Sequence, residues 1–544
     1  MIRRMRCGGG VTQLLAAGAV LLVLSGVAAA RPRASTVARG VASAAAPAPA
    51  KRRVTERADV ARFRARVEKA ITAPGPDKGF WGILVQDAAT GEVLYANHPD
   101  NYFAPASNNK LLTTALALAT LGPDYRIHTT LETRATVDSS GQLRGDLVLV
   151  GRGDANLSNR VFPYLKQVQR DGPPDKVFVE LADAIVAGGI KQIDGDIIAD
   201  DSLFEPERFP DGWTIDDMLW SYGAAVSAIV VNDNTFTLEL RPGEHEGDMA
   251  GFSVEPWADF YKIENAVRTG AKSSEQKIAV VREPGSRTIH VSGTMPLGAD
   301  PHKLVIAVEE PAEYAAALLE HLLEARGVRI YGVARARHAA DPANTAQAAA
   351  ATVLAEHISP TLADDVLLVN KISQNLHAEL LLRLAAREKA GALTLDDALK
   401  FAADFRHTAG IADADVQTED GSGLSRSDLV TPRAVAQILA YAAKQPWGEV
   451  YRSSLPVAGE DGTLSDRMKN TAAADHVFAK TGTLEGASSL SGYAATTRGE
   501  HLIFSIFGNH TGMKSADAEA VLDSITVAMV EELGPEPPRK KKGK

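Results

Sequence analysis

The 544-residue sequence predicts a multidomain α+β protein, in which two helix-bearing regions flank a long β-rich insertion. Apolar residues recur at helical spacing before residue 125 and after residue 350, whereas short alternating runs dominate the stretch between them. The composition, 45% hydrophobic and 23% charged, is ordinary for a globular chain of about three or four domains. It excludes wholesale disorder, and the single cysteine, Cys7, excludes disulfide, zinc-ribbon and iron–sulfur scaffolds.

The first 30 residues have the charged, apolar and small-residue order of a secretory signal. We therefore expect a cleaved signal peptide at 1–30 and a secreted protein of the periplasm or another extracytoplasmic part of the cell envelope. An uncleaved anchor is the alternative, but the apolar run at 14–24 is short for a membrane span of about 20 residues. Residues 31–57, rich in alanine, proline and arginine, predict a disordered linker.

The folded region begins with a predicted hairpin and a helix. Residues 82–87 and 92–96 alternate around a glycine-bearing turn, which is typical of a β-hairpin. Apolar residues at helical spacing then follow Pro105 and stop at Gly122.

The inserted segment, residues 134–344, predicts one or more β-rich domains. A helix at 311–327 begins with proline and ends with glycine, the asymmetry expected of helix ends. The strand-like runs of the insertion lie at 147–150, 193–198, 236–240, 277–281, 288–291 and 303–308.

Helical periodicity returns after the insertion, and three strand-like runs and a last helix follow it. We expect 58–133 and 345–534 to form one domain that the insertion interrupts. The predicted helices lie at 364–387, 394–405, 431–441 and 516–533, and the strands at 477–484, 490–496 and 501–509.

The formal net charge of -10 is unevenly spread, because lysine and arginine concentrate in the two terminal segments. The acidic body excludes nucleic acid as a partner, since phosphate contacts need clustered basic residues. Residues 535–544 predict a basic, disordered tail. The tail is interpreted as a solvated end or, alternatively, as a weak electrostatic contact with anionic membrane lipid or wall polymer.

Ser107 and Lys110 form an S-x-x-K motif at the start of the helix predicted after Pro105. Positions three apart share a helix face, so the amine of Lys110 lies beside the hydroxyl of Ser107. A serine needs a base to become a nucleophile, and a desolvated lysine can serve. The motif alone is weak, because Ser107 could be a helix cap. A second S-x-x-K at Ser274 runs into a predicted strand and is attributed to chance.

Two further motifs follow in the chain. Ser373, Gln374 and Asn375 form S-x-N between helical stretches, and K-T-G begins at Lys480 in a strand-like run. S-x-x-K, S-x-N and K-T-G in this order are the signature of penicillin-recognising serine enzymes.

The sequence resembles the penicillin-binding protein 4 type of D-alanyl-D-alanine carboxypeptidase/endopeptidase over about residues 60–534. The 266 positions between Ser107 and Ser373 leave room for an inserted domain, which class A β-lactamases lack. Gln374 departs from the family pattern, in which Asp or Gly is common at this position. The resemblance extends beyond the three motifs to DGDIIADD at 194–201, DGSGLSR at 420–426 and GEDGTL at 459–464.

The resemblance implies a penicillin-binding-protein/β-lactamase-like core, an antiparallel sheet covered by helices. It implies that Ser107 attacks the carbonyl of the penultimate D-Ala in peptidoglycan stem peptides and forms an acyl-enzyme. Lys110 would accept the proton, Ser373 would help to relay it to the leaving amine, and Asn375 would hold a substrate amide.

The K-T-G strand is implied to bind the free carboxylate of the substrate. Lys480 would attract the carboxylate, with the hydroxyls of Thr481 and Thr483 as donors. Gly482 would allow a close backbone approach. The N–H groups of Ser107 and Thr483 would form the oxyanion hole.

The resemblance implies β-lactam antibiotics as inhibitors and no metal or organic cofactor. None of the histidines, His357 and His377 included, has H-E-x-x-H spacing, so these histidines are interpreted as structural. Trp213 of the insertion is interpreted as a core or domain-contact residue, with sugar or stem-peptide contact as the alternative. Two rival functions remain open, a β-lactamase-like hydrolase and a non-catalytic peptidoglycan-binding scaffold.

Overall fold

The computed structural model describes residues 57–166, 168–339 and 350–535 of the chain. The predicted signal peptide at 1–30 lies outside the described residues, as do almost all of the linker at 31–57 and of the tail at 535–544. In the described ranges, every helix is too short or too polar to cross a bilayer.

One five-stranded sheet joins the two ends of the chain and is antiparallel throughout. Its strand order is β2-β1-β23-β22-β21, so β21 forms an edge. This sheet confirms the predicted hairpin and the three predicted C-terminal strands. The strands are β1 (Phe80–Asp87), β2 (Val93–Asn97), β21 (Val477–Leu484), β22 (Ala487–Ala495) and β23 (His501–Asn509).

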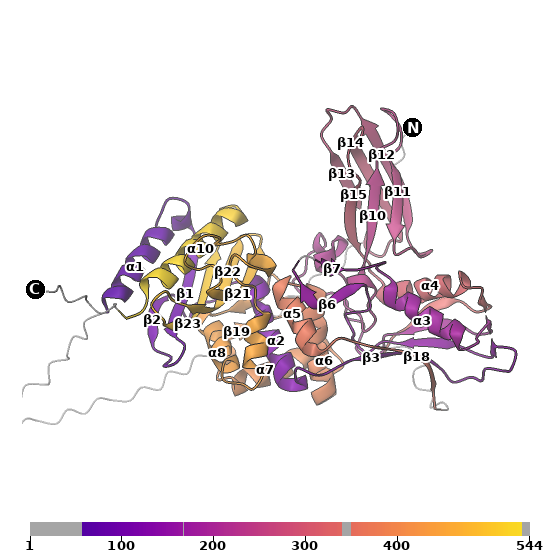
Figure 1. Cartoon of the computed structure of the whole chain (residues 1–544), viewed down its shortest axis with the longest axis horizontal. Coiled ribbons are helices and arrows are strands. Elements are labelled where there is room, and N and C mark those ends of the chain that lie inside the picture. Colours follow the sequence, from indigo (N-terminus) through magenta and orange to yellow (C-terminus); the bar gives the residue numbers. More distant parts are fainter. Residues whose placement is uncertain (1–56, 167, 340–349, 536–544) are drawn as a thin grey trace, which may run out of the picture. The chain divides into compact units, whose positions relative to one another are not determined.

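Helices cover both faces of this sheet because its strands are apolar on both sides (Figure 1). Ile83 and Val85 of β1 pack into a core with α1 and α10, whereas Leu84 between them packs into the core on the opposite face. The α+β core expected from the sequence is thereby confirmed. The helices are α1 (Ala58–Ile71) and α10 (Ser515–Glu532) on the first face, with α2 (Lys110–Leu121), α5 (Leu362–Lys371), α6 (Asn375–Ala390), α7 (Leu395–Thr408), α8 (Pro432–Ala442) and α9 (Gly448–Ser454) supplying the second.

A second five-stranded sheet, of order β17-β9-β5-β3-β18, belongs to the inserted part. Its strands are β3 (His128–Thr133), β5 (Leu147–Val150), β9 (Ile197–Asp200), β17 (Ala334–Arg337) and β18 (Thr352–Ile358). β3 and β18 lie in the sequence segments assigned to the catalytic domain, yet they pair with each other, and β3 also pairs with β5. We therefore propose that the inserted unit begins before β3 and ends after β18.

The rest of the insertion consists of α3 (Lys176–Ala187), α4 (Pro311–Glu324) and small sheets that share one hydrophobic core with the second sheet. Three sheets have three strands each, in the orders β11-β10-β15, β12-β14-β13 and β16-β8-β4. The first two of them lie in one lobe in Figure 1. A two-stranded ribbon of the insertion pairs β6 with β7, and outside the insertion β19 pairs with β20 between α7 and α8. Their bounds are β4 (Gln142–Leu143), β6 (Arg160–Leu165), β7 (Val168–Arg170), β8 (Gln192–Ile193), β10 (Thr235–Arg241), β11 (Gly251–Glu255), β12 (Lys262–Gly270), β13 (Lys277–Val281), β14 (Thr288–Pro296), β15 (His302–Ala307), β16 (Arg329–Ile330), β19 (Val416–Gln417) and β20 (Leu429–Val430).

A buried ion pair holds the loop before β21 against the end of α5. Lys371 Nζ lies 2.8 and 2.7 Å from the two carboxylate oxygens of Asp461 and donates to the carbonyl of Leu455 at 2.6 Å. Both side chains are buried. Removing one partner of such a pair leaves an uncompensated charge in the interior.

We expect Lys371→Met to lower the free energy of unfolding by about 3–5 kcal/mol, because Asp461 is left buried and unpaired. The double variant Lys371→Met/Asp461→Asn should recover more than half of the loss, since the asparagine is neutral. Denaturant unfolding of both variants measures the effect. A loss below about 1 kcal/mol in the single variant would show that the pair does not hold this loop.

Candidate active site

Ser107 lies in a single 3₁₀ turn, Ala106–Asn109, that leads directly into α2. The sequence places Ser107 at the start of the α-helix, but the helix begins at Lys110. Ala106 adopts a φ of 48°, which is uncommon for a residue with a Cβ. A Cβ at Gly423 would overlap the carbonyl of Ala106, so the turn depends on glycine there. The side chain of Ser107 stays half-buried between buried neighbours, which leaves it within reach of a substrate.

Lys110 is fully buried, and its ammonium has three acceptors. Nζ lies 2.9 Å from Ser107 Oγ, 2.6 Å from Asn375 Oδ1 and 2.7 Å from the carbonyl oxygen of Ser422. Burial lowers the pKa of Lys110 to about 7, against the raising effect of nearby acids. A neutral amine can donate its two hydrogens to the Asn375 and Ser422 oxygens, which points its lone pair at Ser107. This geometry suits a general base.

Ser373 and Lys480 form a second pair beside the first. Ser373 lies between α5 and α6 with a φ of 61°, and its Oγ accepts a hydrogen bond of 2.9 Å from Lys480 Nζ. Lys480 also donates to the carbonyl of Thr481 at 2.9 Å. Burial, and then the charge of Lys110, lower the pKa of Lys480. Among the described residues, Ser373 is thus hydrogen-bonded to Lys480, and its role in relaying a proton with Lys110 remains a prediction.

The edge strand β21 passes alongside the Ser107 turn because Gly482 has no side chain. A Cβ at Gly482 would lie 2.7 Å from the Pro105 carbonyl and 3.0 Å from the Ser107 nitrogen. Asn108 Nδ2 donates to the Lys480 carbonyl at 3.1 Å and thereby ties the turn to the strand.

Ser489 of β22 completes this contact, and the sequence motifs predict neither it nor Asn108 as a site residue. Asn108 Nδ2 donates to Ser489 Oγ at 2.8 Å, and Ser489 Oγ donates to the Pro105 carbonyl at 2.7 Å. Asn108 occupies a variable position of S-x-x-K, and Ser489 lies outside the motifs.

The two threonines of β21 have different surroundings. Thr481 is buried, and its Oγ1 lies 2.7 Å from Oγ1 of Thr463, in the GEDGTL stretch. Thr483 is exposed, and its hydroxyl donates to Glu519 of α10 at 2.9 Å. The predicted role of both hydroxyls as carboxylate donors remains a prediction.

Buried acids surround the opposite side of Lys110. Asp420 accepts hydrogen bonds from Trp213 Nε1 at 2.9 Å and from the Ser425 nitrogen at 2.8 Å, which fixes the loop that carries Ser422. Burial raises the pKa of Glu379 to about 7. Trp213 is therefore a buried contact between the insertion and the active-site loop. Within the described ranges, no group of acids and histidines is arranged to hold a metal ion.

The chain is similar to known proteins over most of its length. The sequence profile of the D-Ala-D-Ala carboxypeptidase 3 (S13) family matches residues 63–529. A D-alanyl-D-alanine carboxypeptidase of Actinomadura sp. (strain R39) is 35% identical over 489 residues, which are 88% of this chain and 86% of that protein. The crystal structure of penicillin binding protein 4 (dacB) from Haemophilus influenzae superposes with a TM-score of 0.72 at 24% identity, covering 85% of this chain and 98% of that one. A crystal structure of the same protein complexed with a β-lactam gives a TM-score of 0.67 at 22% identity, covering 87% and 98%.

We expect the rate of acylation by penicillin to rise with pH through about 7 and then level off. Below this pH Lys110 is protonated and cannot accept the Ser107 proton, whereas above it the amine is neutral. Stopped-flow acylation at pH values from about 5.5 to 9 measures the profile. The Lys110→Ala variant should be acylated slowly at every pH, and its rate should not rise through about pH 7. A step that persists in Lys110→Ala would assign the titration to another group.

We expect Gly482→Ala to slow acylation by about 10²–10³-fold, because the new Cβ pushes β21 away from the Ser107 turn. Gly251→Ala is the matched control. Gly251 also lies in a peripheral strand, β11, and a Cβ added there would have nothing within 4 Å. Equal acylation rates in the two variants would contradict the close approach of β21.

Proposed function

Because the chain belongs to the D-Ala-D-Ala carboxypeptidase 3 (S13) family, we propose that Ser107 is the nucleophile of a serine-type D-alanyl-D-alanine carboxypeptidase of the penicillin-binding protein 4 type. The family match spans residues 63–529 and includes all three motifs. The observation that carries the assignment of Ser107 is the 2.9 Å contact of its Oγ with Lys110 Nζ, a buried amine with a lowered pKa.

In acylation, neutral Lys110 takes the proton of Ser107 Oγ as the oxygen attacks the carbonyl of the penultimate D-Ala. The N–H groups of Ser107 and Thr483 bind the oxyanion, a role supported by the closeness of β21 to the turn. The C–N bond then breaks, and the leaving D-Ala amine receives the proton. Ser373 Oγ, which accepts a hydrogen bond of 2.9 Å from Lys480, is proposed to help pass this proton.

In deacylation, water attacks the ester at Ser107 and releases the shortened stem peptide. Asn375 is supported as a substrate-amide ligand by the position of its side chain, whose Nδ2 donates to the Tyr222 carbonyl at 2.7 Å and whose Oδ1 accepts from Lys110. Burial lowers the pKa of Lys480, and a bound carboxylate favours its charged form, so Lys480 is proposed to bind the terminal carboxylate. Thr481 and Thr483 lie on the same strand. A β-lactam, which mimics the same dipeptide, would acylate Ser107 in the same way.

The substrate is the D-Ala-D-Ala end of peptidoglycan stem peptides, and cleavage of the D-Ala–diaminoacyl cross-link is a second candidate activity. A cavity of about 550 Å³ at the end of β21 supports it as a place where the peptide branch could bind. The cavity is lined by Phe80, Tyr102, Arg426 and Leu484 among others. The predicted signal peptide supports a periplasmic or other extracytoplasmic location, and the basic tail supports weak attachment to wall or membrane.

We expect Ser107→Ala to abolish labelling by fluorescent penicillin and D-Ala release from pentapeptide muropeptides, because the nucleophile is lost. Ser274→Ala, in the second S-x-x-K, is the matched control and should keep both. Mass analysis of cross-linked and uncross-linked muropeptides separates the two peptidase activities. Rapid turnover of penicillin would identify a β-lactamase, and a wild type without adduct or product would identify a non-catalytic scaffold.

A further inference from the structure

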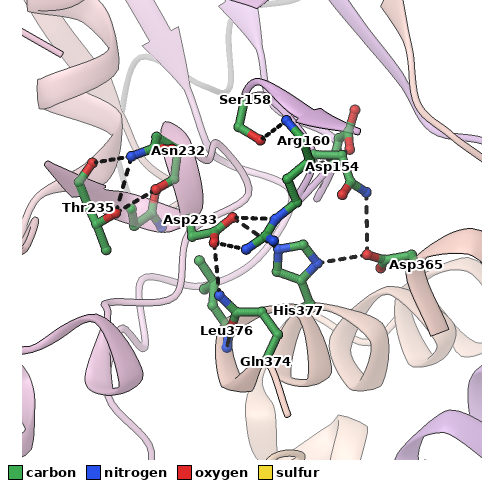
Figure 2. A network of polar contacts seen from close by, with 12 residues as sticks. Asp154, Ser158, Arg160, Asn232, Asp233, Thr235, Asp365, Gln374, Leu376 and His377 are labelled. Atoms are coloured by element: carbon green, nitrogen blue, oxygen red, sulfur yellow. Dashed lines mark hydrogen bonds and ion pairs between the residues drawn. The ribbon is translucent and has the colours of Figure 1, made fainter. Parts of the chain in front are cut away.

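The middle residue of S-x-N contacts the inserted unit directly. Gln374 Nε2 donates to Asp233 Oδ2 at 3.1 Å, and its Oε1 accepts from the Leu376 nitrogen at 2.8 Å, which caps α6 (Figure 2). An amide can do both because it carries a donor and an acceptor. Neither an aspartate nor a glycine at this position could make both bonds.

Asp233 is the centre of the network drawn in Figure 2. It is buried and lies in the turn Asn232–Asn234, in which all three residues have a positive φ, of 48°, 58° and 52°. Arg160 and Arg170 lie opposite each other at the open end of the β6–β7 ribbon. Both pair with the Asp233 carboxylate, Arg170 at 2.8 Å. Burial would raise the pKa of Asp233, but Arg160, His377 and Arg170 hold it well below the usual range. Such a turn persists only when its surroundings fix it.

His377 ties the same carboxylate to α5 and α6. It lies two residues after Asn375 and is fully buried, with Nδ1 2.7 Å from Asp365 Oδ1 and Nε2 3.3 Å from Asp233 Oδ1. Burial would lower the pKa of His377, but the two aspartates raise it to about 9. At neutral pH the ring therefore donates from both nitrogens and links the start of α6 to Asp233.

The residues on either side of Gln374 each contact one active-site lysine. Asn375 Oδ1 lies 2.6 Å from Lys110 Nζ, and Ser373 Oγ lies 2.9 Å from Lys480 Nζ. Ser373 has a positive φ, so its backbone conformation needs support from outside the segment. A shift of this segment would move both contacts together.

Building on the proposed function, we propose that Gln374 and Asp233 are positioning residues: their hydrogen bond fixes Ser373 and Asn375 against the two lysines. The inserted unit thereby acts on the chemical step without touching the substrate. A misplacement of about 1 Å in such an arrangement can cost about 10²-fold in rate.

The test is Gln374→Glu, measured by stopped-flow penicillin acylation that separates the acylation rate constant k2 from the dissociation constant Kd. Glutamate keeps the acceptor for the Leu376 nitrogen, but it replaces the donor to Asp233 with a like charge. Gln142→Glu is the matched control, because Gln142 Nε2 donates to Asp194 in the insertion at 2.9 and 2.7 Å. We expect k2 to fall about tenfold in Gln374→Glu and to be unchanged in the control.

An unchanged k2 in Gln374→Glu would overturn the proposal. If the melting temperature falls while k2 is unchanged, the contact has a structural role only. If Kd alone increases, the new charge repels the anionic ligand. Gln374→Met keeps the length of the side chain without adding a charge, and it should lower k2 about threefold. If the glutamate variant does not fold, this variant tests the positioning role.

Penicillin acylation of the wild-type protein distinguishes a failure of this proposal from a failure of the proposed function on which it rests. If penicillin does not acylate the wild type at Ser107, the proposed function fails. If the wild type is acylated and both Gln374 variants keep its k2, only the positioning role fails.

Discussion

The buried amine of Lys110 is the group on which the arrangement of the site depends. A charged lysine in the interior is costly, and this cost is what lowers its pKa to about 7. Its three acceptors come from S-x-x-K, S-x-N and the loop at Ser422, so a single nitrogen fixes three segments that lie far apart in the sequence. The acids behind it, Glu379 among them, keep the pKa from falling further.

Residues of the insertion contact the segments that form the site. Trp213 is hydrogen-bonded to Asp420, and Asp233 is hydrogen-bonded to His377 near the start of α6. Two of the segments that contact Lys110 are therefore fixed by residues of the inserted unit. Both contacts are buried and hydrogen-bonded, and such contacts transmit small displacements because interiors are close-packed.

Much of the fold could be predicted from local sequence patterns. Strands 477–484 and 501–509 match the observed β21 and β23 residue for residue, because alternation and turn residues are local signals. The pairing of β3 with β18 could not be predicted, since it joins segments more than 200 residues apart. The motifs predicted the residues that converge on Ser107, whereas the partners of Ser373 and Gln374 depend on tertiary packing that no motif encodes.

The pairing of β1 with β23 limits when the first sheet can be completed. Ile83 lies opposite Ile506, so β1 pairs with β23, the central strand of this sheet, only after nearly the whole chain is available. The inserted unit, by contrast, is closed by β3 and β18 and can assemble earlier. Contacts of such long sequence separation are slow to form because a large loop must close first. Ser107 and the K-T-G strand, 373 positions apart in the sequence, can therefore meet only once the C-terminal strands are in place.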